Sequence, residues 1–289
     1  MPAVETLFSF VNRWECDENE HLNVQYYFSR FEEADRQFRL LTGLSDALAG
    51  PRRCRHVRYH RELCVGHVLL MTSYAAVDGP HMLTIVHELR TDDGALAATA
   101  IDGYSAAEGT VRELRRRFKP VELAMPEYAM PRGLPAAVSA MKSTLDGLIA
   151  GGAAIVNRST VTPRNLGPEG RADDELAIGR FTEAAPHVWN MTPMTSSWLA
   201  ERDLGRVAVE MKLAWLGPLK AGDPIIVVSA PIAASRSTFA FRHHLFETRA
   251  SRLAAVCETV ALTMDLKTRK AVPLPDDIRK AILERTLSS

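Results

Sequence analysis

The chain lacks both an excess of one charge and a long apolar run. Its 35 Lys and Arg residues balance 35 Asp and Glu residues, so its formal net charge is zero over 289 residues. A neutral protein has no global electrostatic attraction to nucleic acid or to an anionic membrane. No apolar run approaches the roughly 18 residues of a membrane span, and the acidic Glu5 argues against a secretory signal. We therefore expect a cytoplasmic protein without nucleic-acid or membrane partners.

Cysteine is also scarce. The four cysteines include no C-x-x-C pair, which excludes the dense disulfide framework of small secreted domains. The histidines have no spacing to cysteines or acidic residues that a zinc site would use. We expect reduced thiols and no metal site.

Three polar residues precede a strongly patterned segment. Asp17, Asn19 and His21 alternate in a short turn, after which apolar residues recur at the spacing of one helical face. The apolar residues are Tyr27, Phe31, Ala34, Phe38 and Leu41. The pattern predicts a helix that begins just after the turn. Because helix N-termini favour negative charge, the turn is a candidate site for polar chemistry.

Local signals also set the bounds of this helix. Asn23 is a typical N-cap and Gly43 a typical C-terminal stop, so the helix is predicted over residues 24–42. An apolar run precedes the turn, and four segments after the helix have the composition of strands. The run covers residues 7–11, and the four segments are 52–64, 68–77, 82–89 and 96–104. The order predicts an α+β fold in which an antiparallel meander comes after the helix.

The second half of the sequence resembles the first. Residues 30–34 match residues 180–184 at an offset of 150, and three later matches have offsets of 156 or 157. The offsets rise along the chain, as loop insertions would produce. A tandem duplication is therefore predicted, although two halves that are similar by coincidence remain the alternative. Pro186 falls inside the second helix pattern and is expected to kink or shorten it.

The two copies differ at the polar turn. At the offset of 150, the positions of Asp17, Asn19 and His21 are occupied by Gly167, Glu169 and Arg171. Only the first copy thus carries the candidate site. We predict a first domain over 1–125, a proline-rich linker over 126–152, and a second domain with a C-terminal helix over 153–289.

The pattern Asp-x-Asn-x-His-Leu-Asn-x-x-x-Tyr, which spans residues 17–27, resembles the hotdog-fold thioesterases. It is closest to the acyl-ACP thioesterases and the 4-hydroxybenzoyl-CoA thioesterase group, and the resemblance covers about residues 1–110. It implies a long helix wrapped by a curved antiparallel sheet, repeated as a tandem hotdog whose halves form an intrachain pseudo-dimer. Glu20 stands where the family usually has Gly or another small residue, and Val24 replaces a frequent Asn.

The resemblance also implies a reaction, namely hydrolysis of an acyl-CoA or acyl-ACP thioester with no cofactor and no metal. Asp17 is then the expected catalytic carboxylate, acting as a nucleophile or as a general base. Asn19 would orient the water or the carboxylate, and His21 would share the proton or bind the substrate. Glu33, on the helix, is a reserve catalytic carboxylate. The structural alternative for Asp17 is a plain Asx turn at the helix entry.

Substrate binding is expected from the helix N-terminus. Backbone N–H groups near Asn23 and Val24 could bind the thioester carbonyl oxygen as an oxyanion hole does, and Tyr27 could line the substrate site. The structural alternatives are an ordinary N-cap for Asn23 and a core aromatic residue for Tyr27. Two other functions stay open, a hydratase or dehydratase on the same fold and a non-catalytic acyl-binding protein. A homo-oligomer of double-hotdog chains is also expected.

Overall fold

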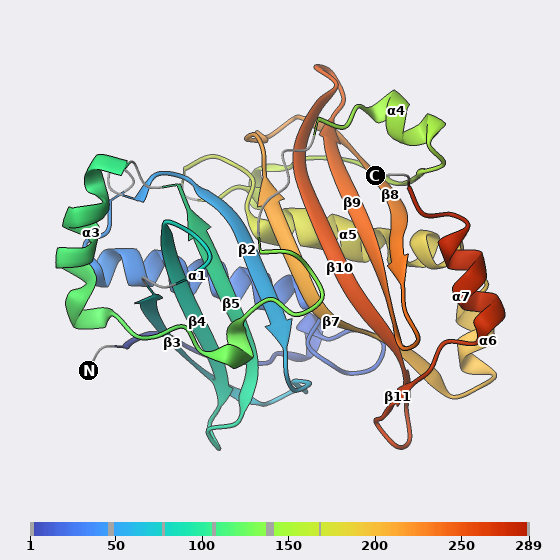
Figure 1. Cartoon of the computed structure of the whole chain (residues 1–289), viewed down its shortest axis with the longest axis horizontal. Helices are drawn as coiled ribbons and strands as arrows, with labels where there is room; N and C mark the ends of the chain where they lie inside the picture. Colours follow the sequence, from blue (N-terminus) through green and yellow to red (C-terminus); the bar gives the residue numbers. More distant parts are fainter. Residues whose placement is uncertain are drawn as a thin grey trace. The chain divides into compact units, whose positions relative to one another are not determined.

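The computed structural model describes residues 3–45, 49–76, 79–105, 108–136, 142–167 and 169–287. The chain divides into two compact units, residues 1–138 and residues 139–289. Each unit consists of an antiparallel sheet and one long helix (Figure 1).

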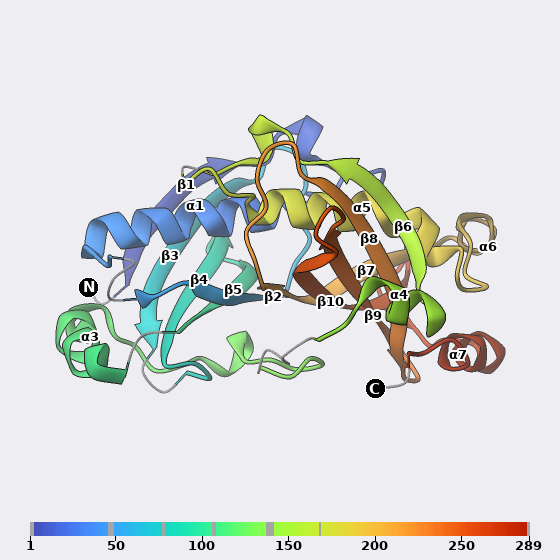
Figure 2. The same ribbon diagram turned by 90° about the horizontal axis from the view of Figure 1, so that it is seen from above.

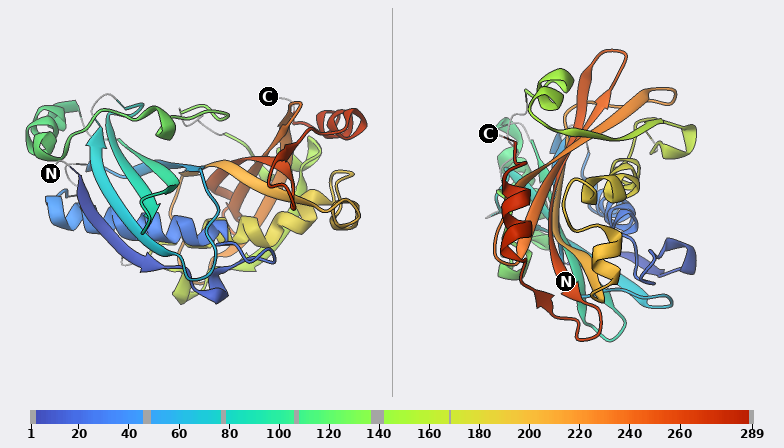
Figure 3. Two further views of the ribbon diagram at one scale, coloured as in Figure 1. Left: turned by 90° about the horizontal axis from the view of Figure 1, so that it is seen from below. Right: turned by 90° about the vertical axis from the view of Figure 1, so that its right-hand side faces the viewer.

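Unit 1 has the predicted helix and antiparallel strands, but the predicted meander is present only in its last three strands. The strand Arg52–Tyr59 pairs with Leu96–Tyr104 instead of with Val68–Ala76, which pairs with Val4–Phe10. Its strand order is β1-β3-β4-β5-β2, and every neighbouring pair is antiparallel. Figure 3 shows its blue-to-green strands curving past the blue helix α1. The elements are β1 (Val4–Phe10), η1 (Arg13–Glu15), α1 (Val24–Thr42), β2 (Arg52–Tyr59), β3 (Val68–Ala76), β4 (Leu83–Thr91), β5 (Leu96–Tyr104), η2 (Glu108–Thr110), α3 (Val111–Phe118), η3 (Lys119–Val121) and η4 (Glu127–Ala129). Residue 77, the predicted end of the second strand segment, lies outside the described residues.

Unit 2 repeats this arrangement and adds short helices. Its strand order is β7-β10-β9-β8-β6, with β11 paired to β10, and Figure 2 shows α5 lying along these strands. The elements are α4 (Leu145–Ala150), β6 (Ala154–Thr160), η5 (Pro163–Asn165), α5 (Asp174–Trp189), α6 (Ser196–Ala200), β7 (Leu204–Trp215), β8 (Pro224–Ala234), β9 (Thr238–Glu247), β10 (Arg252–Asp265), β11 (Ala271–Val272) and α7 (Asp276–Leu283). The predicted C-terminal helix is α7.

The duplication extends to local irregularities. Strands β1 and β6 have the same alternation of exposed and buried residues. Their registers also shift at equivalent points, between Glu5 and Leu7 in one copy and between Ile155 and Asn157 in the other. Helices α1 and α5 begin 150 residues apart. The two copies therefore have the same fold, as the sequence predicts.

The long helix of unit 1 has the predicted bounds. The side chain of Asn23 accepts a hydrogen bond from the N–H of Gln25 at 3.1 Å, and Gly43 ends the helix with a φ of 65°. Four members of the apolar stripe are buried: Tyr27, Phe31, Ala34 and Phe38. The prediction for Leu41 was wrong, because this side chain is 60% exposed. In the last turn it is Phe38 that faces the core, where it stacks on Phe118.

The second long helix is shorter, as expected from its proline. It contains 16 residues against 19 in α1, and it ends three residues after Pro186. Proline has no N–H and its ring clashes with the preceding turn, so a helix rarely continues far beyond it. None of the helices in the described parts of the chain combines the length and the apolar character needed to cross a membrane.

The sheet of unit 1 is covered on both faces over much of its area. Ala75 belongs to the cluster that packs around Phe38 of α1, whereas Tyr74 and Ala76 pack with Ala129 from the segment after α3. Strands covered on both faces are buried nearly continuously, as β4 is. This explains why the meander lacks a clean alternation of apolar and polar residues.

Candidate active site

The polar turn is closed by Asp17. Its Oδ1 accepts hydrogen bonds from the N–H groups of Asn19 at 2.9 Å and His21 at 3.2 Å. The N–H of Asp17 in turn donates to the carbonyl oxygen of His21 at 2.8 Å. Asp17 and His21 are half-buried, and Asn19 is exposed. The predicted triplet therefore lies in one turn, in which Asp17 has the geometry of an Asx turn.

The same turn exists in unit 2 without the polar groups. The N–H of Gly167 donates to the carbonyl oxygen of Arg171 at 2.8 Å, which repeats the Asp17–His21 bond. Gly170 has a φ of 68°, and Glu20 at the equivalent position has a φ of 62°. A positive φ is the reason why glycine suits this position. Glu20 thus occupies a strained backbone conformation, with its side chain exposed.

The N-terminus of α1 lies directly after the turn. The N–H of Asn23 donates to the carbonyl oxygen of Glu15 at 2.9 Å, and its side chain caps Gln25. Val24 is the first helical residue and is half-buried. The first N–H groups of a helix have no partner within the helix. Those of Gln25 and Tyr26 donate to Asn23, so the N–H of Val24 is the candidate donor to an oxyanion. Asn23 fulfils the N-cap role and fixes this end of the helix.

An ion pair holds the start of the site in place. Arg30 of α1 contacts the carboxylate of Glu15 at 2.8 Å and the carbonyl oxygen of Phe10 at 2.8 Å. Burial raises the pKa of Glu15, but the hydrogen bonds from Arg30 and Asn12 outweigh it and the pKa lies below its ordinary value. The pair thus joins β1, the η1 turn and α1 into one support for the polar turn.

The structure adds a carboxylate that sequence reasoning missed. Glu62, in the loop between β2 and β3, places Oε2 at 3.8 Å from Nε2 of His21. The two side chains are 32% and 22% exposed. The loop is held against the turn because the N–H of Leu22 donates to the carbonyl oxygen of Leu63 at 2.7 Å. His21 also forms an isolated antiparallel bridge with Cys64.

A weak signal for Glu62 was present in the sequence. The repeat matches Leu63 to Leu219, and the N–H of Ala172 donates to the carbonyl oxygen of Leu219 in unit 2 just as Leu22 donates to Leu63. At the same offset of 156, Glu62 corresponds to Pro218. The carboxylate therefore occurs only in the copy that has a histidine in its turn.

Tyr27 lies in the core behind the turn. Its side chain is 4% exposed and its ring packs edge-to-face on Tyr59, with centroids 5.1 Å apart. Burial raises the pKa of Tyr27 far above its ordinary value, although a hydrogen bond with the backbone of Leu63 opposes the shift. The structural alternative, a core aromatic residue, describes this position better than a residue open to substrate.

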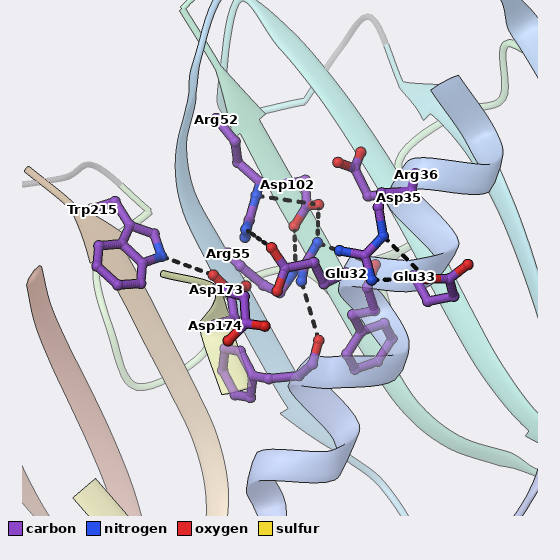
Figure 4. Close-up of polar contacts among 12 residues, drawn as sticks. Glu32, Glu33, Asp35, Arg36, Arg52, Arg55, Asp102, Asp173, Asp174 and Trp215 are labelled. Atoms are coloured by element: carbon purple, nitrogen blue, oxygen red, sulfur yellow. Dashed lines mark hydrogen bonds and ion pairs between the residues drawn. The ribbon is translucent and has the colours of Figure 1, made fainter. Parts of the chain in front are cut away.

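Glu33 is engaged in an ion pair within its own helix. It forms an ion pair with Arg36 at 2.7 Å on the surface of α1, where its side chain is 43% exposed (Figure 4). The equivalent Glu183 forms the same kind of pair with Arg180 at 2.6 Å. Among the residues that the structure describes, no contact joins Glu33 to the Asp17 turn. Both copies therefore use this glutamate in an intrahelical ion pair.

A second polar cluster lies deep between α1 and its sheet. Ser73 Oγ is 2.7 Å from Nδ1 of His87, and Nε2 of His87 is 3.3 Å from Oδ2 of Asp102. All three side chains are fully buried. The cluster contains the residue types of a hydrolytic triad, but substrate and water have no direct access to it. It therefore differs from the Asp17 turn, which is partly exposed.

Arginine neutralises this buried cluster. Arg55 makes two hydrogen bonds to Asp102, at 2.8 and 2.5 Å, and also donates to the carbonyl oxygens of Phe28 and Phe31 in α1 (Figure 4). Burial raises the pKa of Asp102, but the charges of Arg55 and Arg52 outweigh it and hold the pKa well below its usual range. The hydrogen bonds of Arg55 thus connect α1 to the sheet of unit 1.

The same cluster contains a group with metal-ligand spacing. Asp35, His87 and Asp102 offer ligand atoms that all lie within 4.8 Å of one another. These residues are far apart in the sequence, so only the fold brings them together. However, Arg55 already balances the charge of Asp102, and the hydroxyl of Tyr104 donates to Asp35. The donor set fits an internal charge network better than a cation site.

Unit 2 keeps the histidine of this cluster but not the acid. Ser229 Oγ is 2.7 Å from Nδ1 of His243, as in the Ser73–His87 pair. Thr259 occupies the position of Asp102, and Met211 that of Arg55. Burial, together with the neighbouring His244, lowers the pKa of His243 to about 3. His243 is therefore neutral at physiological pH.

The sequence and the structure were both compared with known proteins. Residues 174–282, which lie in unit 2, match the profile of the thioesterase-like superfamily. No curated protein sequence matches the chain significantly.

Several solved structures resemble nearly the whole chain. One is a putative oleoyl thioesterase from Lactobacillus plantarum, with a TM-score of 0.62 and 11% identity, covering 90% of this chain and 96% of that one. An acyl-ACP thioesterase from Bacteroides thetaiotaomicron has a TM-score of 0.61 and 10% identity, with coverage of 90% and 98%. The 12:0-ACP thioesterase from Umbellularia californica has a TM-score of 0.58 and 10% identity, with coverage of 91% and 94%. At such low identity, these likenesses establish the fold alone.

Proposed function

We propose that this chain, whose residues 174–282 match the thioesterase-like superfamily, hydrolyses the thioester of an acyl-CoA or acyl-ACP to a free acid and a thiol. The observation that carries the proposal is the pairing of His21 with Glu62 in a partly exposed turn at the N-terminus of α1. This turn combines an imidazole, a carboxylate and the backbone N–H of a helix N-terminus within a few residues. Because acyl-CoA and acyl-ACP are cytoplasmic thioesters, we place the activity in the cytoplasm.

The carboxylate and the imidazole have distinct proposed roles. Asp17 is the catalytic carboxylate, whose Oδ1 is fixed by two N–H groups while Oδ2 acts in the reaction. As a general base it takes a proton from water, and the resulting hydroxide attacks the thioester carbon. As a nucleophile it attacks directly, and water then hydrolyses the anhydride. Asn19 orients the attacking water in either route.

His21 and the helix N-terminus complete the proposed reaction. The tetrahedral oxyanion accepts a hydrogen bond from the N–H of Val24, at the helix end that Asn23 caps. The carbon–sulfur bond then breaks, and His21 gives its proton to the leaving thiolate. Glu62 stabilises the protonated imidazole, because a neighbouring carboxylate favours the charged form. Tyr27 supports the substrate site from the core side.

Thiol release tests this proposal. The substrates are acyl-CoAs and acyl-ACPs of varied chain length, and the proteins are wild type, Asp17→Asn, Glu62→Gln and Glu33→Gln. We expect Asp17→Asn to lower kcat/KM by about 100-fold or more. Glu62→Gln should cause a smaller loss and move the alkaline limb of the pH–rate profile to lower pH, because His21 acts in its protonated form and loses the carboxylate that favours this form.

The control variant makes this experiment decisive. Glu33→Gln removes a carboxylate of similar exposure from the same unit but outside the turn, so it should leave the rate and the pH profile unchanged. Equal losses in Glu33→Gln and Glu62→Gln would refute the site. Tight acyl-CoA binding without thiol release would instead identify an acyl-binding protein. Turnover of acyl-ACP but not of acyl-CoA would identify ACP as the carrier of the substrate.

A further inference from the structure

Unit 1 leaves aromatic side chains uncovered on its edge strand. Phe8 and Phe10 of β1 are 68% and 53% exposed, and Trp14 in the η1 turn is 77% exposed. Val65 and Val68 are 47% and 43% exposed. We call these five side chains the aromatic patch. Single exposed apolar residues are ordinary, but a group of this size on one strand and its neighbours marks an interaction surface.

The members of the patch are neighbours in the fold. Side chains alternate along a strand, so Phe8 and Phe10 point to the same face of the sheet. Phe10 is directly paired with Val68 of β3. Val65 lies beside this pair, because the backbone of Val11 is bonded to that of the 65–67 loop by two hydrogen bonds, at 2.9 and 3.0 Å. Trp14 follows Phe10 by four residues, in the η1 turn.

The second copy shows that the fold does not need these side chains. Strand β6 has the same burial pattern and the same register shift as β1. At the offset of 150, Phe8, Phe10 and Trp14 correspond to residues that are polar and exposed: Arg158, Thr160 and Arg164. An identical element is therefore stable with a polar surface. The aromatic residues of unit 1 must serve something other than folding.

We propose that the aromatic patch is a homodimer interface, in which a second copy of the chain packs on it through the same patch about a two-fold axis. Such an isologous contact closes on itself and uses one surface of each copy. Phe and Trp are typical of the buried centre of protein interfaces.

The exposed area of the aromatic patch is large enough to contribute much of an interface with a second copy of the chain. An aromatic side chain carries roughly 150–250 Å² of surface, so the exposed fractions of the three rings leave about 400 Å² in each copy. Two copies would bury about 800 Å² from the rings alone, compared with the roughly 1,200 Å² at which stable specific interfaces begin. The two valines and the polar residues around the patch supply the remainder.

The charges at the ends of β1 are also self-complementary. Glu5 lies near the beginning of the strand and Arg13 lies just after its end, and both are exposed. A two-fold axis at Ser9 makes the two strands antiparallel. Each Glu5 then lies near Arg13 of the second copy, and Phe8 lies near Phe10 of that copy. The same arrangement thus gives two ion pairs around an aromatic centre.

The contact uses side chains rather than strand pairing. Arg30 donates a hydrogen bond to the carbonyl oxygen of Phe10 at 2.8 Å, so this part of the strand edge is already occupied. Continuous addition of a second β1 to the sheet is therefore blocked. The outer face of the strand, where the rings lie, remains open to a second copy.

Analytical ultracentrifugation and light scattering test the proposal on the full chain. We expect wild type to have twice the monomer mass. The double variant Phe8→Arg and Phe10→Thr takes its residues from β6, so the fold should tolerate it. Its dimer dissociation constant should rise by at least about 100-fold, because aromatic residues at the centre of an interface dominate its affinity. The matched control replaces Arg158 and Thr160 with Ala and should leave the dimer intact.

A charge exchange provides a second readout. Glu5→Arg alone should weaken the dimer, because it places two arginines together, and Glu5→Arg with Arg13→Glu should restore it. A wild-type chain that stays monomeric at the highest soluble concentration would overturn the proposal. A dimer dissociation constant that is unchanged in both the aromatic and the charge variants would also overturn it. If the monomer instead binds lipid vesicles through the patch, the patch is a membrane-binding surface and the homodimer proposal is wrong.

Discussion

Replacing Arg55 with Met should destabilise unit 1 strongly. Arg55 and Asp102 are both fully buried and joined by two hydrogen bonds. In Arg55→Met the carboxylate loses its principal counter-charge but stays inside the protein. Two carbonyl oxygens of α1, those of Phe28 and Phe31, lose a donor at the same time. Methionine is a fair test residue, because Met211 occupies the equivalent position in unit 2.

The size of the effect can be worked out from this geometry. Breaking a buried ion pair by removing one partner costs about 3–5 kcal/mol, because the remaining charge is uncompensated. His87 still contacts Asp102 at 3.3 Å, and Arg52 lies 4.0 Å away. These groups soften the loss without replacing two short hydrogen bonds. We therefore expect the free energy of unfolding to fall by about 4 kcal/mol.

Urea unfolding followed by circular dichroism measures this loss. The matched control is the double variant Arg55→Met with Asp102→Thr, which copies the Met211–Thr259 arrangement of unit 2. Because the double variant removes both charges of the pair, it leaves neither one unpaired and should recover most of the lost stability. If the double variant is no more stable than Arg55→Met, the unpaired charge is not the cause. A single variant within about 1 kcal/mol of wild type would refute the reasoning outright.

Backbone strain and a buried histidine give two further predictions. Glu20→Gly should stabilise the protein by up to about 1 kcal/mol, because a positive φ strains residues other than Gly. Gly170→Ala should destabilise it by a similar amount, and thermal unfolding that ranks the two variants in the opposite order would contradict this. His243 has a folded-state pKa of about 3 against 6.5 for the free side chain. The unfolded state therefore binds more protons below pH 6.5, so stability should fall as the pH drops from about 6.5 towards 3, by up to about 1.4 kcal/mol per pH unit. His243→Asn should remove that part of the slope in urea titrations at different pH values, and an unchanged slope would argue against a neutral His243.

The helix, the turn and the repeat could be predicted because their causes are local or periodic. Asn23 and Gly43 act on the backbone within one turn of the helix, so the bounds of α1 can be read from the residue types. The burial of Phe31 and Phe38 results from the period of the helix. The duplication can be read because two similar stretches encode the same element twice.

The carboxylate partner of His21 could not be predicted in this way. Glu62 is 41 residues further along the chain (62 − 21), and it approaches His21 only because the loop after β2 bonds to the turn at Leu22 and Leu63. The repeat distinguishes Glu62 from Pro218 of the second copy, but no period or motif connects Glu62 with His21. The prediction that Leu41 is buried was wrong for a related reason. Periodicity assigns a residue to one face of the helix, but it does not show whether another element packs against that residue.

The sequence by itself therefore determined the elements, their order, the duplication and the turn that carries Asp17, Asn19 and His21. These depend on interactions between residues a few positions apart, or on a pattern repeated along the chain. Only the tertiary structure decided that Glu62 faces His21, that Arg55 neutralises Asp102, and that Phe8 and Phe10 are left uncovered. Each of these depends on the register of strands and the course of loops, which long-range packing sets after the local elements have formed.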